Sequence, residues 1–220
     1  MGDAATTVLG SSQLIGIMRF HDGGDVSGAV DALARGGIEL LEITIDTPGA
    51  LAAVELAAGN GHTVGVGTIV SGAQVDECAA AGARFVVSPG LSVEVIERAY
   101  ELGLEPIPGI FTATELLAAE AAGARIMKLF PASCGGPGYL RALRGPFPTA
   151  ALVPTGGVRI DEIRAYLDAG ATVVALGGEL VGRSAPRTDS DLEWIASQAA
   201  SAASNSVAVK MPGIGSRPSS

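Results

Sequence analysis

The sequence is poor in aromatic residues, cysteine and histidine. Phe, Trp and Tyr make up 4% of its 220 residues, which argues against an aromatic-rich β-sandwich. The two cysteines, Cys78 and Cys134, are too few for a disulfide framework and lie in no metal-binding spacing. We therefore expect reduced thiols in a cytoplasmic protein, with Cys134 as a small buried side chain. Neither of the two histidines has a carboxylate at ligand spacing, so no metal site and no cofactor are predicted.

Positive charge is also scarce. The formal net charge is −9, which argues against a surface for nucleic acid or for an anionic membrane. No apolar run approaches the length of a membrane span, and the first residues lack the layout of a signal peptide. The expected partners are therefore small molecules. An anionic substrate stays compatible with this composition, because a local pocket can be positive inside an acidic protein.

The sequence does have a repeat of short apolar runs. Eight runs rich in Val and Ile start 21 to 25 residues apart, at 15–20, 40–45, 63–68, 84–89, 105–110, 126–131, 151–156 and 173–178. The segments between them are rich in helix formers, and five of them end at a glycine where a left-handed C-cap is expected: Gly36, Gly82, Gly103, Gly123 and Gly170.

Alternation of strand and helix predicts parallel strands joined by crossover helices. Eight such units most simply close into a (β/α)8 TIM barrel in a single domain, and a doubly wound open sheet is the second choice. We expect a lead-in over residues 1–12, the barrel over 13–204 with its last helix at 191–203, and a disordered tail over 205–220 that is rich in Pro, Gly and Ser.

In such a barrel the active site lies where the strands end. The ends of the predicted strands carry these residues: Arg19; Glu42, Thr44 and Asp46; Gly67 and Thr68; Ser88 and Pro89; Lys128; Thr155, Gly156 and Gly157; and Gly177 and Gly178. The spacing of two along the second strand predicts that Glu42, Thr44 and Asp46 share one side of it.

Lys128 and Glu42 are ionisable groups inside otherwise apolar strands. One interpretation is a structural ion pair. The other is a Schiff-base lysine with a carboxylate that moves protons, because burial among Ile126, Leu129 and Phe130 favours the neutral, nucleophilic amine. The paired glycines of the last two strands allow backbone N–H groups to approach an anion, although such pairs are as often plain turns.

Several segments together resemble one enzyme family. LEITI, GVGT, SPG, PGIFTATE, KLFPAS, GPFP and VPTGGV, in this order from about Ile15 to Val181, resemble the 2-keto-3-deoxy-6-phosphogluconate and 4-hydroxy-2-oxoglutarate (KDPG/KHG) aldolases. The resemblance implies a metal-free class I aldolase on a (β/α)8 barrel that needs no cofactor and forms a homotrimer. IGIMR and GPGYLRAL are similar to the branch that includes the 6-phosphogalactonate aldolases.

The resemblance also implies roles for individual residues. Lys128 matches the lysine that forms the imine with pyruvate, and Glu42 matches the carboxylate that moves protons through a bound water. The predicted substrate-binding residues are Arg19, Thr68, Pro89, Thr155, Gly156, Gly157, Gly177 and Gly178. Thr68 and Pro89 match the pyruvate pocket, and Gly156, Gly157 and Gly177 match the phosphate-binding turns.

Three positions depart from the family pattern. Asp46 stands where many members have an arginine that receives the substrate carboxylate, so Arg19 is the candidate for this task. Gly178 stands where the family often has a serine that helps to hold phosphate, and the neighbouring Glu179 adds negative charge. Asp46 itself is a candidate to bind hydroxyls of the aldehyde half.

The predicted function is cleavage of a 2-keto-3-deoxy-6-phospho sugar acid, of phosphogluconate or phosphogalactonate type, or of 4-hydroxy-2-oxoglutarate. The products are pyruvate and an aldehyde. Two alternatives stay open: a phosphosugar isomerase or epimerase with Glu42 as base and Lys128 as an electrostatic aid, and a non-catalytic barrel that binds a sugar acid while Lys128 pairs with Glu42.

Overall fold

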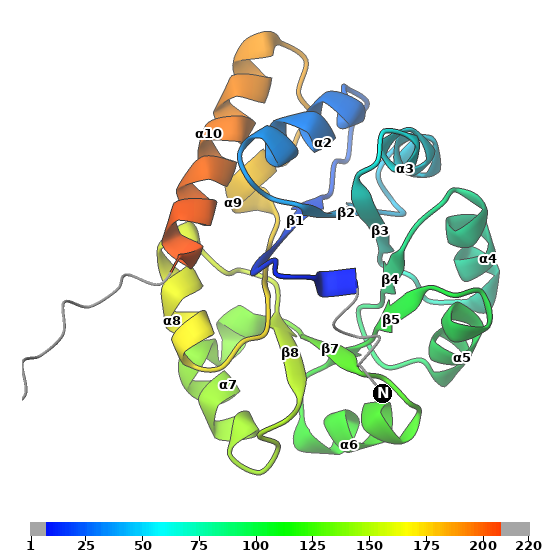
Figure 1. The fold of residues 1–220 in the computed structure, drawn as a ribbon, viewed down its shortest axis with the longest axis vertical. Coiled ribbons are helices and arrows are strands. Elements are labelled where there is room, and N and C mark those ends of the chain that lie inside the picture. The colour runs from blue at the N-terminus through cyan, green and yellow to red at the C-terminus, as the bar shows by residue number, and fades with distance from the viewer. Residues whose placement is uncertain (1–7, 208–220) are drawn as a thin grey trace, which may run out of the picture.

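The computed structural model describes residues 8–207, in which short strands alternate with helices (Figure 1). The elements are β1 (Leu14–Met18), α2 (Val26–Arg35), β2 (Leu40–Thr44), α3 (Ala50–Gly59), β3 (Thr63–Gly67), α4 (Gly72–Ala80), β4 (Phe85–Val87), α5 (Val93–Glu101), β5 (Glu105–Ile107), β6 (Gly109–Ile110), α6 (Ala113–Ala121), β7 (Ile126–Leu129), the 3-10 helix η1 (Ala132–Cys134), α7 (Gly136–Arg144), β8 (Ala151–Pro154), the 3-10 helix η2 (Ile160–Glu162), α8 (Ile163–Asp168), β9 (Val174–Leu176), α9 (Gly178–Val181) and α10 (Asp189–Ser206).

The two chain ends differ in part from their prediction. Asn205 and Ser206, which the sequence assigned to a disordered tail, belong to α10. Residues 1–7 of the predicted lead-in and residues 208–220 of the predicted tail lie outside the described residues.

Every strand pairs in parallel with its neighbours, so the prediction of a parallel α/β fold is confirmed. The strands form a six-stranded sheet in the order β5-β4-β3-β2-β1-β9 and a three-stranded sheet in the order β6-β7-β8. A parallel bridge between Thr155 and Ala175 links β8 to β9. Figure 1 shows the strands gathered at the centre of the molecule with the helices around them.

The fifth predicted strand is divided in two. β5 pairs with β4 and β6 pairs with β7, and Pro108 lies between the two short strands. Proline has no N–H to donate, so a strand breaks readily at this residue. The Pro108 carbonyl still accepts a hydrogen bond from the backbone N–H of Lys128, at 2.9 Å.

Alternate residues of the strands pack into two apolar clusters. One cluster joins inward residues of both sheets, namely Ile15, Ile17, Leu40, Phe85, Val87, Ile107, Ile126, Val153, Val173 and Ala175, and Leu9 packs against them. The larger cluster joins the other strand face to the helices, as Leu41, Ile43, Val64 and Val66 do. Because side chains alternate along a strand, the inward position after Leu40 is Glu42 and the one after Ile126 is Lys128.

The helix ends follow their sequence signals with one exception. Positive φ angles occur at Gly82, Gly103, Gly123 and Gly170, as predicted for left-handed C-caps. In α2 the left-handed residue is Gly37, with φ 93°, and the predicted Gly36 has φ −77°. A Cβ at Gly36 would lie 2.3 Å from the Cβ of Ala199, so this glycine lets α10 approach α2 closely.

Both cysteines are free thiols. Cys78 is buried, and burial raises the pKa of its thiol to about 12. Cys134 is exposed at the end of η1, so the prediction that it is buried is wrong. Within residues 8–207 no helix combines the length and the apolar character that a membrane crossing requires.

Candidate active site

A cavity of about 680 Å³ opens where the strands end, and all ten predicted site residues line it. They are Arg19, Glu42, Thr68, Pro89, Lys128, Thr155, Gly156, Gly157, Gly177 and Gly178. Their side chains or backbones come from β1, β2, β3, β4, β7, β8 and β9 or from the residues that directly follow these strands. The parallel strand order thus gathers residues that lie up to 159 positions apart (Arg19 to Gly178).

Lys128 reaches the cavity from the middle of β7. All four residues of this strand are buried, and Lys128 is 7% exposed. Its Nζ lies 5.0 Å from the centroid of the Phe130 ring, within the range of a cation–π contact. No hydrogen bond or ion pair joins its amine to another described residue. The amine is therefore held by packing and opens onto the cavity.

Glu42 lies on β2 and is 2% exposed. Its carboxylate occupies the place that a side chain of Gly67 would fill, since a Cβ at Gly67 would lie 2.0 Å from Glu42 Oε1. Burial raises the pKa of the Glu42 carboxyl, and the charges of Lys128 and Arg19 offset part of this effect. A carboxyl of this kind can take up and return a proton near neutral pH more readily than an exposed one.

The two buried groups do not form an ion pair. Within the described part of the chain, no nitrogen of Lys128 lies within 4.0 Å of a carboxylate oxygen, so the interpretation as a structural Lys128–Glu42 pair is wrong. Buried charged groups are normally paired or functional. Here both face the same cavity, and neither forms a hydrogen bond or ion pair through its side chain with a described residue, an arrangement that suits reaction with a bound molecule.

Arg19 lies at the mouth of the cavity, with its side chain 47% exposed. It donates a hydrogen bond from Nη2 to the hydroxyl of Thr68, and its Nη1 lies 3.9 Å from Asp46 Oδ2. Asp46 does not line the cavity, so it contacts Arg19 from outside. The suggestion that Asp46 binds substrate hydroxyls thus finds no support in its position.

Thr68 has φ 67°, which is rare for a β-branched residue. Left-handed residues other than glycine cost of order 1–3 kcal/mol and gather at functional sites. The conformation points the Thr68 hydroxyl toward Arg19 at the cavity mouth.

The far end of the cavity is formed by backbone. Gly156 and Gly157 have φ 90° and 71°, and side chains there would collide with Phe130 and with Ser133 Oγ. Their N–H groups donate to no acceptor among the described residues. Thr155 turns its hydroxyl back to the Val153 carbonyl, at 3.1 Å, so it contributes a wall rather than a donor. At Gly178 a Cβ would meet nothing within 4 Å, and the cavity is wide at this point.

Sequence reasoning missed several residues that line the cavity, among them Phe130, Arg159 and Arg183. Phe130 lies inside the motif KLFPAS and Arg159 directly follows the motif VPTGGV, so their positions in the sequence could have identified them. Arg183 lies in an irregular segment between α9 and α10, where no periodicity indicates which way a side chain points.

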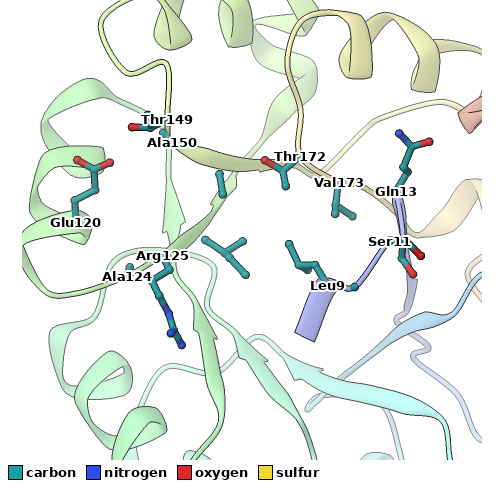
Figure 2. A pocket seen from close by; sticks show the side chains of 14 residues that line it. Leu9, Ser11, Gln13, Glu120, Ala124, Arg125, Thr149, Ala150, Thr172 and Val173 are labelled. Carbon is teal, nitrogen blue, oxygen red and sulfur yellow. The ribbon is translucent and has the colours of Figure 1, made fainter. Parts of the chain in front are cut away.

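A second cavity, of about 520 Å³, lies at the opposite end of the strands (Figure 2). Figure 2 shows Leu9, Ser11 and Gln13 of the N-terminal segment on one side of it and Glu120 and Arg125 on the other. Arg125 is paired with Glu105, and no lysine lines this cavity. Residues 8–207 contain no group of three or more His, Cys, Asp or Glu residues placed to hold a metal ion.

Comparison with known proteins assigns the chain to a family. The family model "KDPG and KHG aldolase" matches residues 6–197. A 2-dehydro-3-deoxy-6-phosphogalactonate aldolase from Escherichia coli (strain K12) is 35% identical over 181 residues, which are 80% of this chain and 88% of the relative.

Two solved structures extend the comparison. A KDPG aldolase from Legionella pneumophila, with pyruvate captured as a covalent carbinolamine intermediate, superposes with a TM-score of 0.81 at 29% identity and covers 92% of this chain and 99% of that one. A cube-shaped protein cage, designed by fusing symmetric oligomeric domains, superposes with a TM-score of 0.80 at 32% identity over 88% of this chain and 72% of that one. The match of the family model over almost the whole chain settles the classification: the chain belongs to the KDPG and KHG aldolase family.

Proposed function

We propose that the chain is a pyruvate-dependent class I aldolase, an aldehyde-lyase that cleaves 2-keto-3-deoxy-6-phospho sugar acids into pyruvate and a phosphorylated aldehyde. One observation carries the proposal: Lys128 and Glu42 are both more than nine-tenths buried, their side chains form no hydrogen bond or ion pair with any residue in the range 8–207, and both open onto one cavity. Membership of the family and the phosphogalactonate aldolase relative support the substrate class.

We also propose that the two sheets form one closed (β/α)8 barrel. Three contacts support closure. The Thr155–Ala175 bridge joins the sheets on one side, the Lys128 N–H to Pro108 carbonyl bond joins them on the other, and β5 runs into β6 across a single residue. Closure would fix the distance between Glu42 and Lys128, which come from different sheets.

The reaction begins at Lys128. The neutral amine attacks the C2 carbonyl carbon of the keto acid, and a C–N bond forms while the carbonyl oxygen takes up a proton. Loss of this oxygen as water gives the imine, protonated on nitrogen, which serves as the electron sink. Glu42 supplies and accepts the protons that these steps require, acting through a water molecule.

Carbon–carbon cleavage follows from the same pair. Glu42 removes the proton of the C4 hydroxyl, the C3–C4 bond breaks, and its electrons flow into the imine to give an enamine. The aldehyde leaves with its new C=O bond. Return of a proton to C3 and hydrolysis of the imine release pyruvate and restore the Lys128 amine, and condensation uses these steps in reverse.

The remaining site residues bind and orient the substrate. Arg19 and the Thr68 hydroxyl hold the carboxylate next to the imine carbon, since a guanidinium matches a carboxylate in shape and charge. Pro89 and Thr155 close the sides of the pyruvate pocket. The N–H groups around Gly156, Gly157, Gly177 and Gly178 face the distal phosphate, where glycine allows close approach of the backbone.

Location and assembly complete the proposal. We infer a cytoplasmic enzyme of carbohydrate metabolism that works as a homotrimer, which the family resemblance supports. The designed cage built from symmetric oligomeric domains agrees with a symmetric oligomer. Sedimentation equilibrium at micromolar concentration tests the trimer, and a mass equal to one or two chains would contradict it.

Borohydride trapping tests the imine. The sequence is well suited to this experiment, because Lys128 and Lys210 are its two lysines. Reduction in the presence of pyruvate should add the reduced three-carbon acid to the peptide that contains Lys128. The adduct should be absent from Lys128→Ala and unchanged in the control Lys210→Arg.

The same variants measure turnover. Lys128→Ala should lose cleavage activity while its circular dichroism spectrum stays that of the wild type. If pyruvate binds to the wild type and no adduct forms, or if Lys128→Ala cleaves at the wild-type rate, the imine mechanism is wrong. The isomerase alternative, or a sugar-acid-binding barrel without the Lys128–Glu42 ion pair, then becomes the better account.

A further inference from the structure

A guanidinium without a protein partner borders the glycine end of the cavity. Arg183 follows α9 after Gly182, whose φ of 72° turns the chain, and it lines the cavity together with Gly156, Gly157 and Gly178. Its side chain is exposed, and it makes no hydrogen bond or ion pair with any residue in the range 8–207. Its positive charge is therefore free to act on a molecule in the cavity.

The acids near Arg183 already have other partners. Arg183 also borders a hollow lined by Asp22 and Asp191. Asp22 accepts hydrogen bonds from the Ala185 N–H and from Arg187, and Asp191 accepts from the N–H groups of Arg187 and Thr188. These bonds lower the pKa of both carboxyls, and within residues 8–207 neither carboxylate forms an ion pair with Arg183.

The other arginine at this end of the cavity, Arg159, differs from Arg183 because it has an acidic partner. Arg159 is paired with Asp161, and this bond, with the charges of Asp161, Glu162 and Glu179, raises the pKa of the Arg159 guanidinium. Three carboxylates thus act on Arg159. Arg183 is the one cavity-lining arginine in the described chain for which no carboxylate contact occurs, because Arg19 is paired with Asp46.

We propose that Arg183 is a specificity-determining residue that contacts the distal phosphate of the substrate. This inference rests on the proposed aldolase function and deepens it. At Gly178 there is no hydroxyl to hold the phosphate, and Glu179 brings a negative charge to the same wall. The fork of N–H donors on Arg183 supplies both the missing donors and the missing positive charge.

The test compares phosphorylated and unphosphorylated substrates. The kcat/KM of wild type, Arg183→Gln and Arg183→Lys is measured with 2-keto-3-deoxy-6-phosphogluconate and with 2-keto-3-deoxygluconate. A charge-assisted contact to phosphate is worth at least about tenfold in kcat/KM. We expect Arg183→Gln to lose about this factor on the phosphorylated substrate alone, with Arg183→Lys intermediate because it keeps the charge and loses the fork.

Arg35→Gln is the matched control. Arg35 is exposed in the last turn of α2, makes no ion pair with a described residue and does not line the cavity. The same change of net charge at this position should leave both kcat/KM values unaltered.

Two outcomes overturn the proposal: equal losses on both substrates in Arg183→Gln, or no loss on either. Borohydride trapping of pyruvate separates this failure from failure of the aldolase function, because pyruvate carries no phosphate. An intact adduct on Lys128 in the wild type and in Arg183→Gln, with an unchanged substrate ratio, refutes the role of Arg183 only.

Discussion

The substitution Gly67→Ala tests whether the position of the Glu42 carboxylate limits the reaction. The new Cβ would lie 2.0 Å from Glu42 Oε1, and real Cβ contacts essentially never fall below 3.0 Å, so the carboxylate must move by about 1 Å (3.0 − 2.0). A displacement of this size in a catalytic group costs about 100-fold in rate, or about 2.7 kcal/mol of activation free energy.

Folding should tolerate this change. The nearest atoms to the new Cβ belong to the end of the Glu42 side chain, which can rotate, and φ at Gly67 is not in the left-handed region. Replacing glycine by alanine also reduces the conformational freedom of the unfolded chain. We therefore expect the free energy of unfolding to change by less than about 1 kcal/mol.

Exchange of the pyruvate methyl protons with deuterium provides the assay. Exchange requires the imine, proton removal at C3 and proton return, and it is followed by NMR without an aldehyde. In Gly67→Ala, borohydride should still trap pyruvate on Lys128, while exchange and cleavage should both fall about 100-fold. The control is Gly59→Ala, at the end of α3, where a Cβ meets nothing within 4 Å. Wild-type exchange in a stable Gly67→Ala protein would refute Glu42 as the proton carrier.

Three further changes test the electrostatics of the site. Because burial raises the pKa of Glu42, the wild type loses stability as the pH rises from the unfolded-state pKa to the folded-state pKa. Glu42→Gln should therefore be inactive yet more stable than the wild type at pH 7, and this gain in the free energy of unfolding should shrink toward pH 4 in urea titrations. A constant difference in stability across this pH range would contradict the raised pKa of Glu42. Thr68→Gly should relieve about 1 kcal/mol of backbone strain while raising KM for pyruvate, whereas Thr68→Ser should keep the wild-type KM. The Arg19–Asp46 pair is long and nearly half exposed, and such pairs contribute at most about 1 kcal/mol. Asp46→Asn removes this competitor for the Arg19 guanidinium, so it should strengthen pyruvate binding by up to about fivefold in a calorimetric titration. Weaker binding would mean that Asp46 positions Arg19.

The sequence predicted the fold wherever periodicity decided the outcome. The spacing of apolar runs located seven of the eight predicted strands to within two residues at each end, and the remaining run covers both β5 and β6, because alternation of strand and helix leaves few arrangements. It failed where a single residue decided. Pro108 divides one predicted strand, and Gly36 is needed for contact with α10 rather than for a turn. Neither the strand break at Pro108 nor the contact of Gly36 with α10 can be recognised from the local sequence pattern.

The same division applies to the site. Alternation along a strand places Glu42 and Lys128 on inward faces. The two-residue periodicity of strands and the parallel strand order therefore predicted that both residues face the same cavity. Their lack of a mutual ion pair was not predictable, because it depends on how two strands from different sheets are set apart. The role of Arg183 was not predictable either. Its position at the cavity depends on the turn at Gly182, and its lack of an ion pair depends on nearby acids that bind other partners.

The glycines of this site act as much through the space they leave as through the turns they allow. Sequence reasoning assigned Gly156 to phosphate binding, yet the ring of Phe130 fills the space that a side chain at Gly156 would need. At Gly67, to which no role was assigned, the carboxylate of Glu42 fills the corresponding space. That ring in turn covers the amine of Lys128, at 5.0 Å. The absence of a side chain at Gly67 and Gly156 thus lets the carboxylate of Glu42 and the ring of Phe130 take their places in the cavity wall. The buried, unpaired state of Lys128 and Glu42, on which the proposed chemistry depends, follows from these small residues as directly as from the charged ones.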